Sequence, residues 1–131
     1  HASYANYKGT SALSEPESKA LADLANSANW TMTISYHSMG NLVYWDFAGN
    51  KVAEQSKELA ELVTGISGYR TNRSSGKGGF KDYVQIKDSP IPSLTIEVGS
   101  VACPLPLSEF DKVWKQNKAV WVQAMKFVAT K

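Results

Sequence analysis

The sequence has one cysteine, almost no charge imbalance and no long apolar run. Because Cys103 is the only cysteine and has no histidine near it in the sequence, we expect a structural thiol and no internal disulfide. The 14 basic and 12 acidic residues give a net charge of +2. That balance argues against nucleic acid or a membrane surface as a partner, and no run approaches the roughly 20 apolar residues that span a bilayer. The 131 residues are enough for one domain with a hydrophobic core.

Histidine is also scarce. His1 and His37 are the only two, and the motif His-x-x-Glu, which can supply two metal ligands, occurs nowhere. A catalytic zinc ion normally takes three protein ligands and one water molecule. One internal histidine is therefore too few to hold such an ion within this chain. The chain also begins without methionine, so we expect a mature, trimmed or engineered product.

Two strand patterns end in polar side chains. Residues 31–37 alternate between apolar and polar and end at His37, and residues 93–98 alternate in the same way with Glu97 near their end. Between them, the apolar and aromatic residues 41–47 predict a second strand or an extended segment. Both His37 and Glu97 lie on the polar side of their strand.

Two capping motifs mark helix starts. Ser14 and Glu17 form a capping box, which predicts a short helix that ends at about Asn26. Ser108, followed by an acidic first turn, caps a last helix. The side chains expected to face inward are Ala20, Leu21, Leu24 and Ala25 in the first helix, and Phe110, Val113, Trp114, Val120, Trp121, Met125 and Val128 in the last.

The middle of the chain combines helix and loop. Residues 51–66 carry an apolar face typical of a helix. Five glycines between residues 65 and 79 predict a loop of about fifteen residues, a length that is usually functional or mobile. A short helix is expected over residues 80–87. Strands separated by helices favour an α/β fold with a mostly parallel or mixed sheet and flanking helices.

Open sheets of this kind bind ligands beyond the carboxyl ends of their strands, which singles out His37 and Glu97. Each has a simpler interpretation: a lone histidine is more often a structural residue than a ligand, and Glu97 could face water on an edge strand. A carboxylate within an apolar strand is costly, however, unless it is paired or functional. Together the two residues match a metal-bound water with a neighbouring general base.

Four segments carry a resemblance to one family. Residues 34–45, ISYHSMGNLVYW, resemble the segment of zinc carboxypeptidases that holds the third zinc ligand. Residues 78–83, GGFKDY, followed by residues 91–97, IPSLTIE, resemble the segment that ends in the catalytic glutamate. The capping box fits the helix that precedes the zinc-histidine strand. Residues 103–110, CPLPLSEF, look like the bacterial branch that cleaves cell-wall peptides, the γ-D-glutamyl-L-diamino acid peptidases.

The resemblance implies roles for individual residues. His37 falls on the third zinc ligand, and Glu97 falls on the general base that deprotonates the attacking water and passes the proton to the leaving amine. Lys81 falls on the pocket position that selects the substrate side chain, where a lysine would favour a carboxylate such as that of D-glutamate or diaminopimelate. A solvated loop lysine is the alternative. Arg70 and Arg73 flank the same loop and could also bind carboxylates, or could be solvated charges.

Two departures from the family pattern matter. The loop tyrosine that covers the substrate should lie four residues before the paired glycines, where this chain has Ser74, and the nearest tyrosine, Tyr69, is out of register. That difference suits an endopeptidase better than a digestive carboxypeptidase. The larger departure is that the amino-terminal half of the family's domain, with the His-x-x-Glu motif and the substrate-clamping arginines, is missing. Residues 1–131 therefore look like one partial domain, the carboxyl-terminal half.

For the intact domain, the resemblance implies zinc-dependent hydrolysis of a peptide bond, in peptidoglycan stem peptides of a bacterium, at an extracellular or cell-wall location. The chain alone is expected to be inactive and to bind no zinc tightly. Its expected partners are a peptide or peptidoglycan fragment, and either the missing half or a second copy, because a half sheet leaves an unpaired edge and an uncovered apolar face. The alternatives are an inactive binding or self-associating module, and a purely structural fragment.

Overall fold

The computed structural model describes residues 9–46, 52–73 and 79–131, which fall into two compact units, residues 1–30 and 31–131. Ser74, at the position of the family's loop tyrosine, and Gly78, the first of the paired glycines, lie outside the described residues. The prediction of one partial domain over residues 1–131 stays a prediction. In the part of the chain that is described, no helix is both long and apolar enough to cross a membrane.

The first unit contains the predicted short helix, α1, over Pro16–Asn26. Its N-cap is Glu15 and not Ser14, and no side chain caps the helix. A proline is favoured at the first helical position and holds the residue before it in an extended conformation, so Pro16 moves the start by one residue. The Ser14 hydroxyl oxygen instead accepts a hydrogen bond from the backbone N–H of Thr10 at 3.1 Å.

The buried face of α1 differs from the predicted one. Ala22 and Ala25 are buried, whereas Leu21 and Leu24 are exposed. The two alanines are three residues apart and so share one side of the helix. Of the four side chains predicted to face inward, only Ala25 does so.

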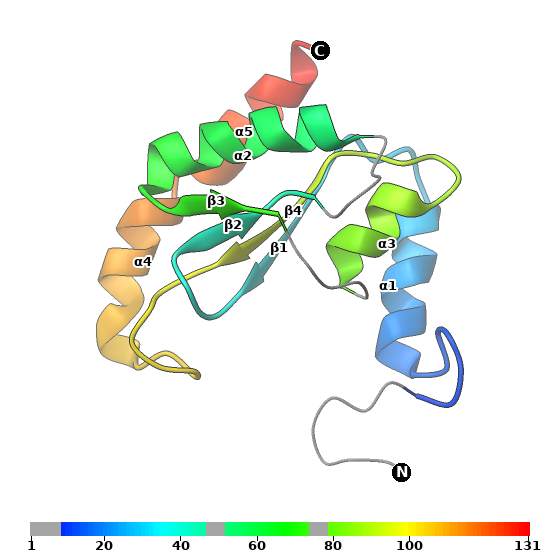
Figure 1. The fold of residues 1–131 in the computed structure, drawn as a ribbon, viewed down its shortest axis with the longest axis horizontal. Helices are drawn as coiled ribbons and strands as arrows, with labels where there is room; N and C mark the ends of the chain where they lie inside the picture. The colour runs from blue at the N-terminus through cyan, green and yellow to red at the C-terminus, as the bar shows by residue number, and fades with distance from the viewer. Residues whose placement is uncertain (1–8, 47–51, 74–78) are drawn as a thin grey trace. The chain divides into compact units, whose positions relative to one another are not determined.

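The second unit is built on a mixed sheet of four strands in the order β1-β4-β2-β3 (Figure 1). The strands are β1 Thr33–His37, β2 Leu42–Tyr44, β3 Arg70–Asn72 and β4 Ser93–Glu97. The pairs β1/β4 and β2/β3 are parallel, and β2/β4 is antiparallel. The predicted α/β class with a mostly parallel or mixed sheet is therefore confirmed.

Strand β3 lies inside the segment predicted to be a loop. Its three residues are polar and all exposed, so they lack the alternation that marks a half-buried strand. Main-chain bonds hold it at the edge of the sheet: Arg70 N donates to Asn41 O at 3.1 Å, and Trp45 N donates to Asn72 O at 3.3 Å.

Helices pack against this sheet. The helices are α2 Ala53–Ser67, α3 Phe80–Ile86, α4 Phe110–Asn117 and α5 Val120–Ala129. Helix α2 contacts strands β2, β3 and β4 and helix α5, and α3 lies against β1 and β4. The core gathers where α2 and α5 meet the sheet, and it consists of Val43, Leu59, Ala60, Val63, Tyr69, Leu94, Ile96, Val120 and Ala124. Each fully buried Val, Leu or Ile side chain contributes roughly 1.5–3 kcal/mol to stability.

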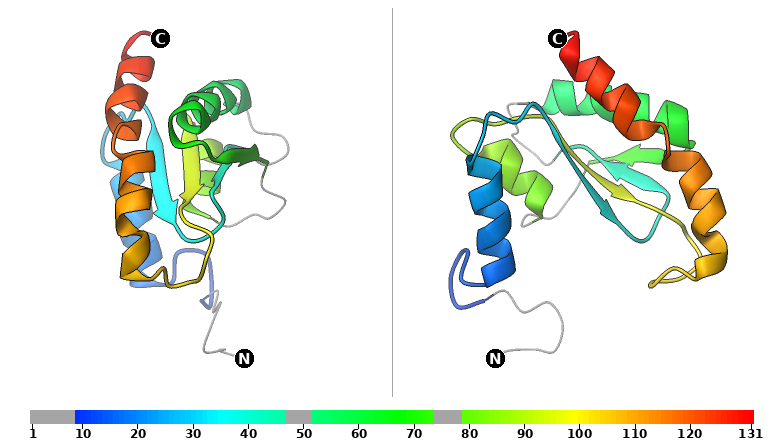
Figure 2. Two further views of the ribbon diagram at one scale, coloured as in Figure 1. Left: turned by 90° about the vertical axis from the view of Figure 1, so that its left-hand side faces the viewer. Right: turned by 180° about the vertical axis from the view of Figure 1, so that it is seen from behind.

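The predicted last helix is two helices with a short 3-10 helix, η1, over Leu107–Glu109 before them. Figure 2 shows α4 leading into α5 with a bend between them. The N-cap of α4 is Glu109 and its side chain makes no capping bond, so the predicted cap at Ser108 is wrong. Val120, at the start of α5, is buried as predicted.

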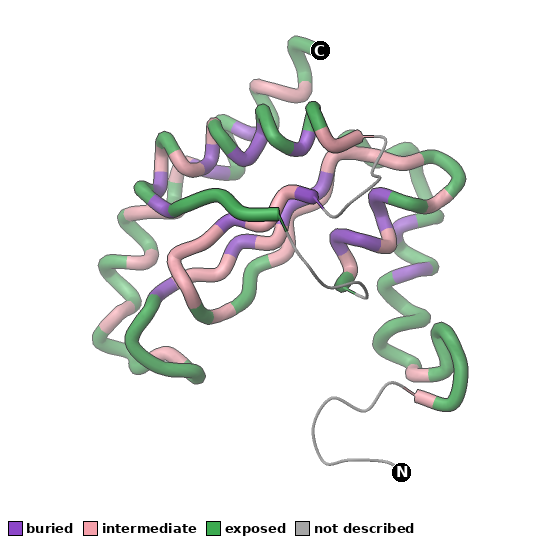
Figure 3. The backbone as a smooth tube through the Cα atoms, viewed as in Figure 1, coloured by how far each residue is buried: buried purple, intermediate pink, exposed green. Residues whose placement is uncertain are grey.

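Four large side chains that were predicted to face inward from these helices are exposed instead: Phe110, Trp114, Trp121 and Met125. Phe110 and Trp114 are 59% and 58% exposed and stack with ring centroids 6.4 Å apart. The burial map in Figure 3 shows mostly exposed and intermediate backbone along both helices. Helix α5 reaches the core through Val120 and Ala124, whereas α4 has no buried residue and contributes none to the core. We call these four residues the α4–α5 apolar face.

Candidate active site

His37 and Glu97 are direct neighbours across the parallel pair β1/β4, where the register matches them. Neighbouring strands are about 4.8 Å apart, so the imidazole and the carboxylate begin from adjacent main chains. The His37 carbonyl oxygen accepts the N–H of Val98 at 2.9 Å, which continues the ladder past the end of the strand. The structure therefore brings the two sequence-predicted residues together at the carboxyl ends of their strands.

Both side chains are available for a ligand. His37 is exposed and Glu97 is half-buried. In the described part of the chain, neither side chain has a hydrogen bond or an ion pair. The same residues contain no group of three or more His, Cys, Asp or Glu side chains that could hold a metal ion. The chain thus fits one imidazole ligand and one carboxylate, and it does not fit a complete zinc site.

A tight turn after β1 fixes the position of His37. The N–H groups of Gly40 and Asn41 both donate to the carbonyl oxygen of Gly99, at 2.7 and 3.0 Å. Gly99 has a φ of 66°, and a Cβ atom there would lie 2.6 Å from Leu105 Cδ2. Glycine at position 99 therefore allows the positive φ and leaves room for the Leu105 side chain, while its carbonyl oxygen accepts both bonds from the turn.

The single cysteine lies beside that turn. The Cys103 Sγ atom is 3.5 Å from the Ser38 hydroxyl oxygen and donates to the Ser38 carbonyl oxygen at 3.7 Å. Cys103 is exposed and free. Its contacts are those of a thiol that packs against the loop, in line with the structural interpretation.

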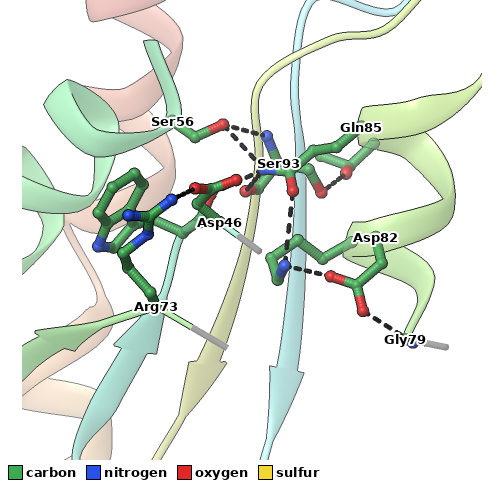
Figure 4. Close-up of polar contacts among 10 residues, drawn as sticks. Asp46, Ser56, Arg73, Gly79, Asp82, Gln85 and Ser93 are labelled. Atoms are coloured by element: carbon green, nitrogen blue, oxygen red, sulfur yellow. Dashed lines mark hydrogen bonds and ion pairs between the residues drawn. The ribbon is translucent and has the colours of Figure 1, made fainter. Parts of the chain in front are cut away.

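Lys81 is not a solvated loop lysine, so that alternative is wrong. It lies in α3, is 3% exposed and forms an ion pair with Asp82 (Figure 4). Its ammonium also lies 3.5 Å from the side-chain oxygen of Gln85. The Asp82 carboxylate accepts the N–H of Gly79 at 3.3 Å, which closes the start of the helix. A substrate carboxylate at Lys81 would have to compete with Asp82.

Gln85 ties several segments together at the amino end of β4. Its side-chain nitrogen shares two N–H donors among three acceptors, Trp45 O at 2.8 Å, Ser56 Oγ at 2.9 Å and Ser93 O at 3.1 Å. Sequence reasoning did not single out Gln85 or Ser56. The available signal was a polar residue on an apolar helix face, because Ser56 precedes the buried Leu59 by one turn of α2.

Arg73 binds a buried carboxylate. Its Nη2 atom lies 2.7 Å from Asp46 Oδ2, and its guanidinium lies 5.3 Å from the centroid of the Trp45 ring. The side chain of Asp46 is fully buried, whereas that of Arg73 is 59% exposed. Because β2 and β4 are antiparallel, the carboxyl ends of β2 and β3 lie at the opposite end of the sheet from His37. Arg73 follows β3 and so lies far from His37 and Glu97.

Two curated proteins are similar to this chain. The γ-D-glutamyl-L-diamino acid endopeptidase 1 of Lysinibacillus sphaericus is 33% identical over 121 residues, which are 92% of this chain and 30% of that protein. The uncharacterized protein YqgT of Bacillus subtilis strain 168 is 29% identical over 129 residues, which are 95% of this chain and 34% of that protein. The chain thus spans about a third of the length of these relatives. No solved structure matches it significantly.

The family comparison covers most of the sequence. The model of the zinc carboxypeptidase family matches residues 2–120. That range includes both strand ends that carry His37 and Glu97, and the match agrees with the four-stranded mixed sheet and its helices. The chain therefore belongs to the zinc carboxypeptidase family.

Proposed function

We propose that this chain supplies one metal ligand, His37, and the general base, Glu97, to a zinc peptidase. The single observation that carries the proposal is the register that pairs these two side chains in a member of the zinc carboxypeptidase family. The proposed substrate is a peptide bond of a peptidoglycan stem peptide, of the γ-D-glutamyl-diamino acid type. The similarity to the Lysinibacillus sphaericus endopeptidase supports that choice.

Each residue has a defined task in this proposal. A neutral imidazole at His37 donates a nitrogen lone pair, and the Glu97 carboxylate takes a proton from the attacking water and later gives it to the leaving amine. The metal, when the whole site binds it, supplies Lewis acidity for the carbonyl and a lower pKa for the water. The other metal ligands must come from residues other than His37 and Glu97.

The proposal keeps Lys81 and Arg73 as substrate-binding residues. Each already contacts a carboxylate, Asp82 for Lys81 and Asp46 for Arg73. A substrate carboxylate at either residue would therefore share a cation with a protein carboxylate. Such sharing lowers the gain from binding relative to a free cation.

A second candidate function is an inactive half domain that acts as a binding or self-associating module. The observation that favours it is the α4–α5 apolar face, because large exposed apolar patches mark interaction sites. The two functions differ in what lies upstream of His1 in the gene. A His-x-x-Glu motif there supports the peptidase, and a gene without one would leave the module or a purely structural fragment.

The test of the catalytic role uses the protein with its complete ligand set and a γ-D-glutamyl-diaminopimelate peptide. We expect Glu97→Gln to lower turnover by roughly 10²–10⁴-fold with unchanged zinc content, and His37→Ala to lose zinc. The control is Glu61→Gln, at an exposed position of α2, which should leave both unchanged. Activity retained in Glu97→Gln would remove Glu97 from its role.

The chain alone allows a second test. Zinc titration should find no tight stoichiometric site in the monomer, because the described residues offer one imidazole beside one carboxylate. Binding with sub-micromolar affinity would contradict the proposal that further ligands are needed.

A further inference from the structure

One row of side chains crosses the whole sheet at the His37 end. The register pairs His37 with Glu97, Glu97 with Leu42, and Leu42 with Arg70. Residues paired directly across strands point to the same face of a sheet. The row therefore places His37, Glu97, Leu42 and Arg70 on one face, in that order.

This face is the one that points away from the core. Val43 and Ile96, which neighbour the row along their strands, are fully buried in the core with α2 and α5. Successive residues of a strand point to opposite faces. The side chains of Leu42 and Glu97, both half-buried, therefore lie on the opposite face from the core.

Arg70 is held within reach of the catalytic pair. Two strand spacings separate it from Glu97, which puts their Cα atoms about 10 Å apart. Its main chain is fixed by the β2/β3 ladder and by the bond from Arg70 N to Asn41 O at 3.1 Å. A fixed main chain limits where the guanidinium can go.

Arg70 and Arg73 differ in their partners. Arg73 already binds Asp46, whereas the exposed guanidinium of Arg70 makes no hydrogen bond or ion pair with the residues that the structure describes. A guanidinium presents several N–H donors in a planar fork that matches a carboxylate. Arg70 is thus the arginine with its donors available, and it is the one at the His37 end of the sheet.

We propose that Arg70 is a specificity-determining residue that binds a carboxylate of the substrate, from a main-chain position two strands away from Glu97. The inference rests on the proposed function and adds a substrate feature to it. A γ-D-glutamyl bond uses the side-chain carboxyl of D-glutamate and leaves its α-carboxylate free, and the diamino acid carries carboxylates of its own. Either carboxylate could bind the Arg70 guanidinium while the peptide bond lies at Glu97.

The first test titrates the chain itself with glutarate and monitors binding by NMR of the backbone amides. Glutarate should shift the amides of Leu42 and Arg70 with saturation, and the neutral diamide of glutarate should not. Arg70→Gln should weaken glutarate binding at least tenfold. The affinity of Arg70→Lys should lie between those of the unaltered chain and Arg70→Gln. Lys57→Gln, an equal charge change at an exposed position of α2, should have no effect. Glutarate shifts that are absent, or that survive Arg70→Gln, would overturn the inference.

The second test separates the two sources of the carboxylate and uses the protein with its complete ligand set. Peptides are prepared with the D-glutamate α-carboxyl or the diamino acid carboxyl converted to the amide. Arg70→Gln should lower kcat/KM by roughly 10–100-fold on the free acid and should remove discrimination against one of the two amides. If Arg70→Gln lowers kcat/KM equally on all substrates, or does not lower it at all, the assignment of Arg70 is contradicted. No turnover of any peptide by the unaltered protein would instead contradict the proposed function, and the glutarate result would still decide whether Arg70 binds carboxylates.

Discussion

Lys81 and Asp82 form a charge pair that is almost fully withdrawn from water, with side chains 3% and 8% exposed. Removing one member leaves the other charge buried without that partner, which typically costs several kcal/mol. The sequence showed both charges but not their burial, because adjacent residues near the start of a helix are usually solvated. Tertiary packing buries them, because α3 lies against β1 and β4 in the described part of the chain.

Replacing Lys81 tests this pair. Lys81→Met should lower the free energy of unfolding by about 3 kcal/mol, measured by urea denaturation, because the Asp82 carboxylate loses its buried cation. The double variant Lys81→Met/Asp82→Asn should recover part of that loss. Lys57→Met at an exposed position should change stability by less than about 0.5 kcal/mol. Losses that simply add in the double variant would show that the two charges are not coupled.

Tyr36, next to His37, gives a prediction for alkaline pH. Partial burial, together with the charge of Tyr69, raises the pKa of Tyr36 above its ordinary value of 10.0. The folded protein therefore holds this proton more tightly than the unfolded chain does. The contribution of Tyr36 to stability is present in full below pH 10 and is lost as the pH rises through the higher pKa of the folded state.

Ultraviolet absorbance of tyrosinate should show a group that ionises above its ordinary pKa of 10.0, and Tyr36→Phe should remove it. Urea denaturation at rising pH should show a decline in stability above about pH 10 that is smaller in Tyr36→Phe. An unchanged titration curve in that variant would contradict the assignment.

Among the strands, the two with clear apolar–polar alternation could be predicted from the sequence, and the exposed edge strand could not. The alternation of residues 31–37 and 93–98 predicted β1 and β4 and placed His37 and Glu97 at their ends. Strand β3 was missed because its residues are polar and exposed. Its pairing with β2 depends on tertiary context. Because β3 was not predicted, the sequence did not show that Arg70 lies in the same row as His37 and Glu97.

The segment after β4 requires glycine at position 99, because the residue has a positive φ and lies against Leu105. Gly99→Ala should lower the free energy of unfolding by roughly 1–3 kcal/mol, because alanine is strained at this positive φ and its Cβ would overlap Leu105. Gly65→Ala is a matched control, because no atom lies within 4 Å of a Cβ there. Gly65 lies in the last turn of α2, where alanine should raise stability by up to about 0.5–1 kcal/mol. Urea denaturation measures both, and equal effects of the two changes would contradict this interpretation of Gly99.

At the scale of the whole molecule, the sheet and the last two helices leave surfaces without a described partner. Strand β1 is at one edge of the described sheet, and Tyr36 in it keeps 40% of its surface exposed. The α4–α5 apolar face adds two tryptophans, a phenylalanine and a methionine. Exposed edges and apolar patches favour association with another chain. The sequence analysis assigned these side chains to the core because a pattern shows which side of a helix is apolar, and not what covers it.

We expect the isolated chain to self-associate through the α4–α5 apolar face. Light scattering should show a mass that rises with concentration, and Phe110→Ser/Trp114→Ser should shift the protein toward the monomer without loss of helical circular dichroism. Lys115→Ser, at an exposed position of the same helix, should have no effect. A clean monomer of the unaltered chain at all concentrations would contradict this prediction.

The pairing of β1 with β4 also has a consequence for the order of events in folding. Thr33 and Ser93, at the start of this ladder, are 60 residues apart in the chain. Closing so long a loop costs entropy before any contact offsets it, and non-local strand pairing is slow compared with helix formation. During synthesis, His37 leaves the ribosome well before Glu97, and the helices between them can form first. The two residues can become neighbours only after residues 38–96 have been made, so the candidate site assembles later than the helices that lie between its two strands in the sequence.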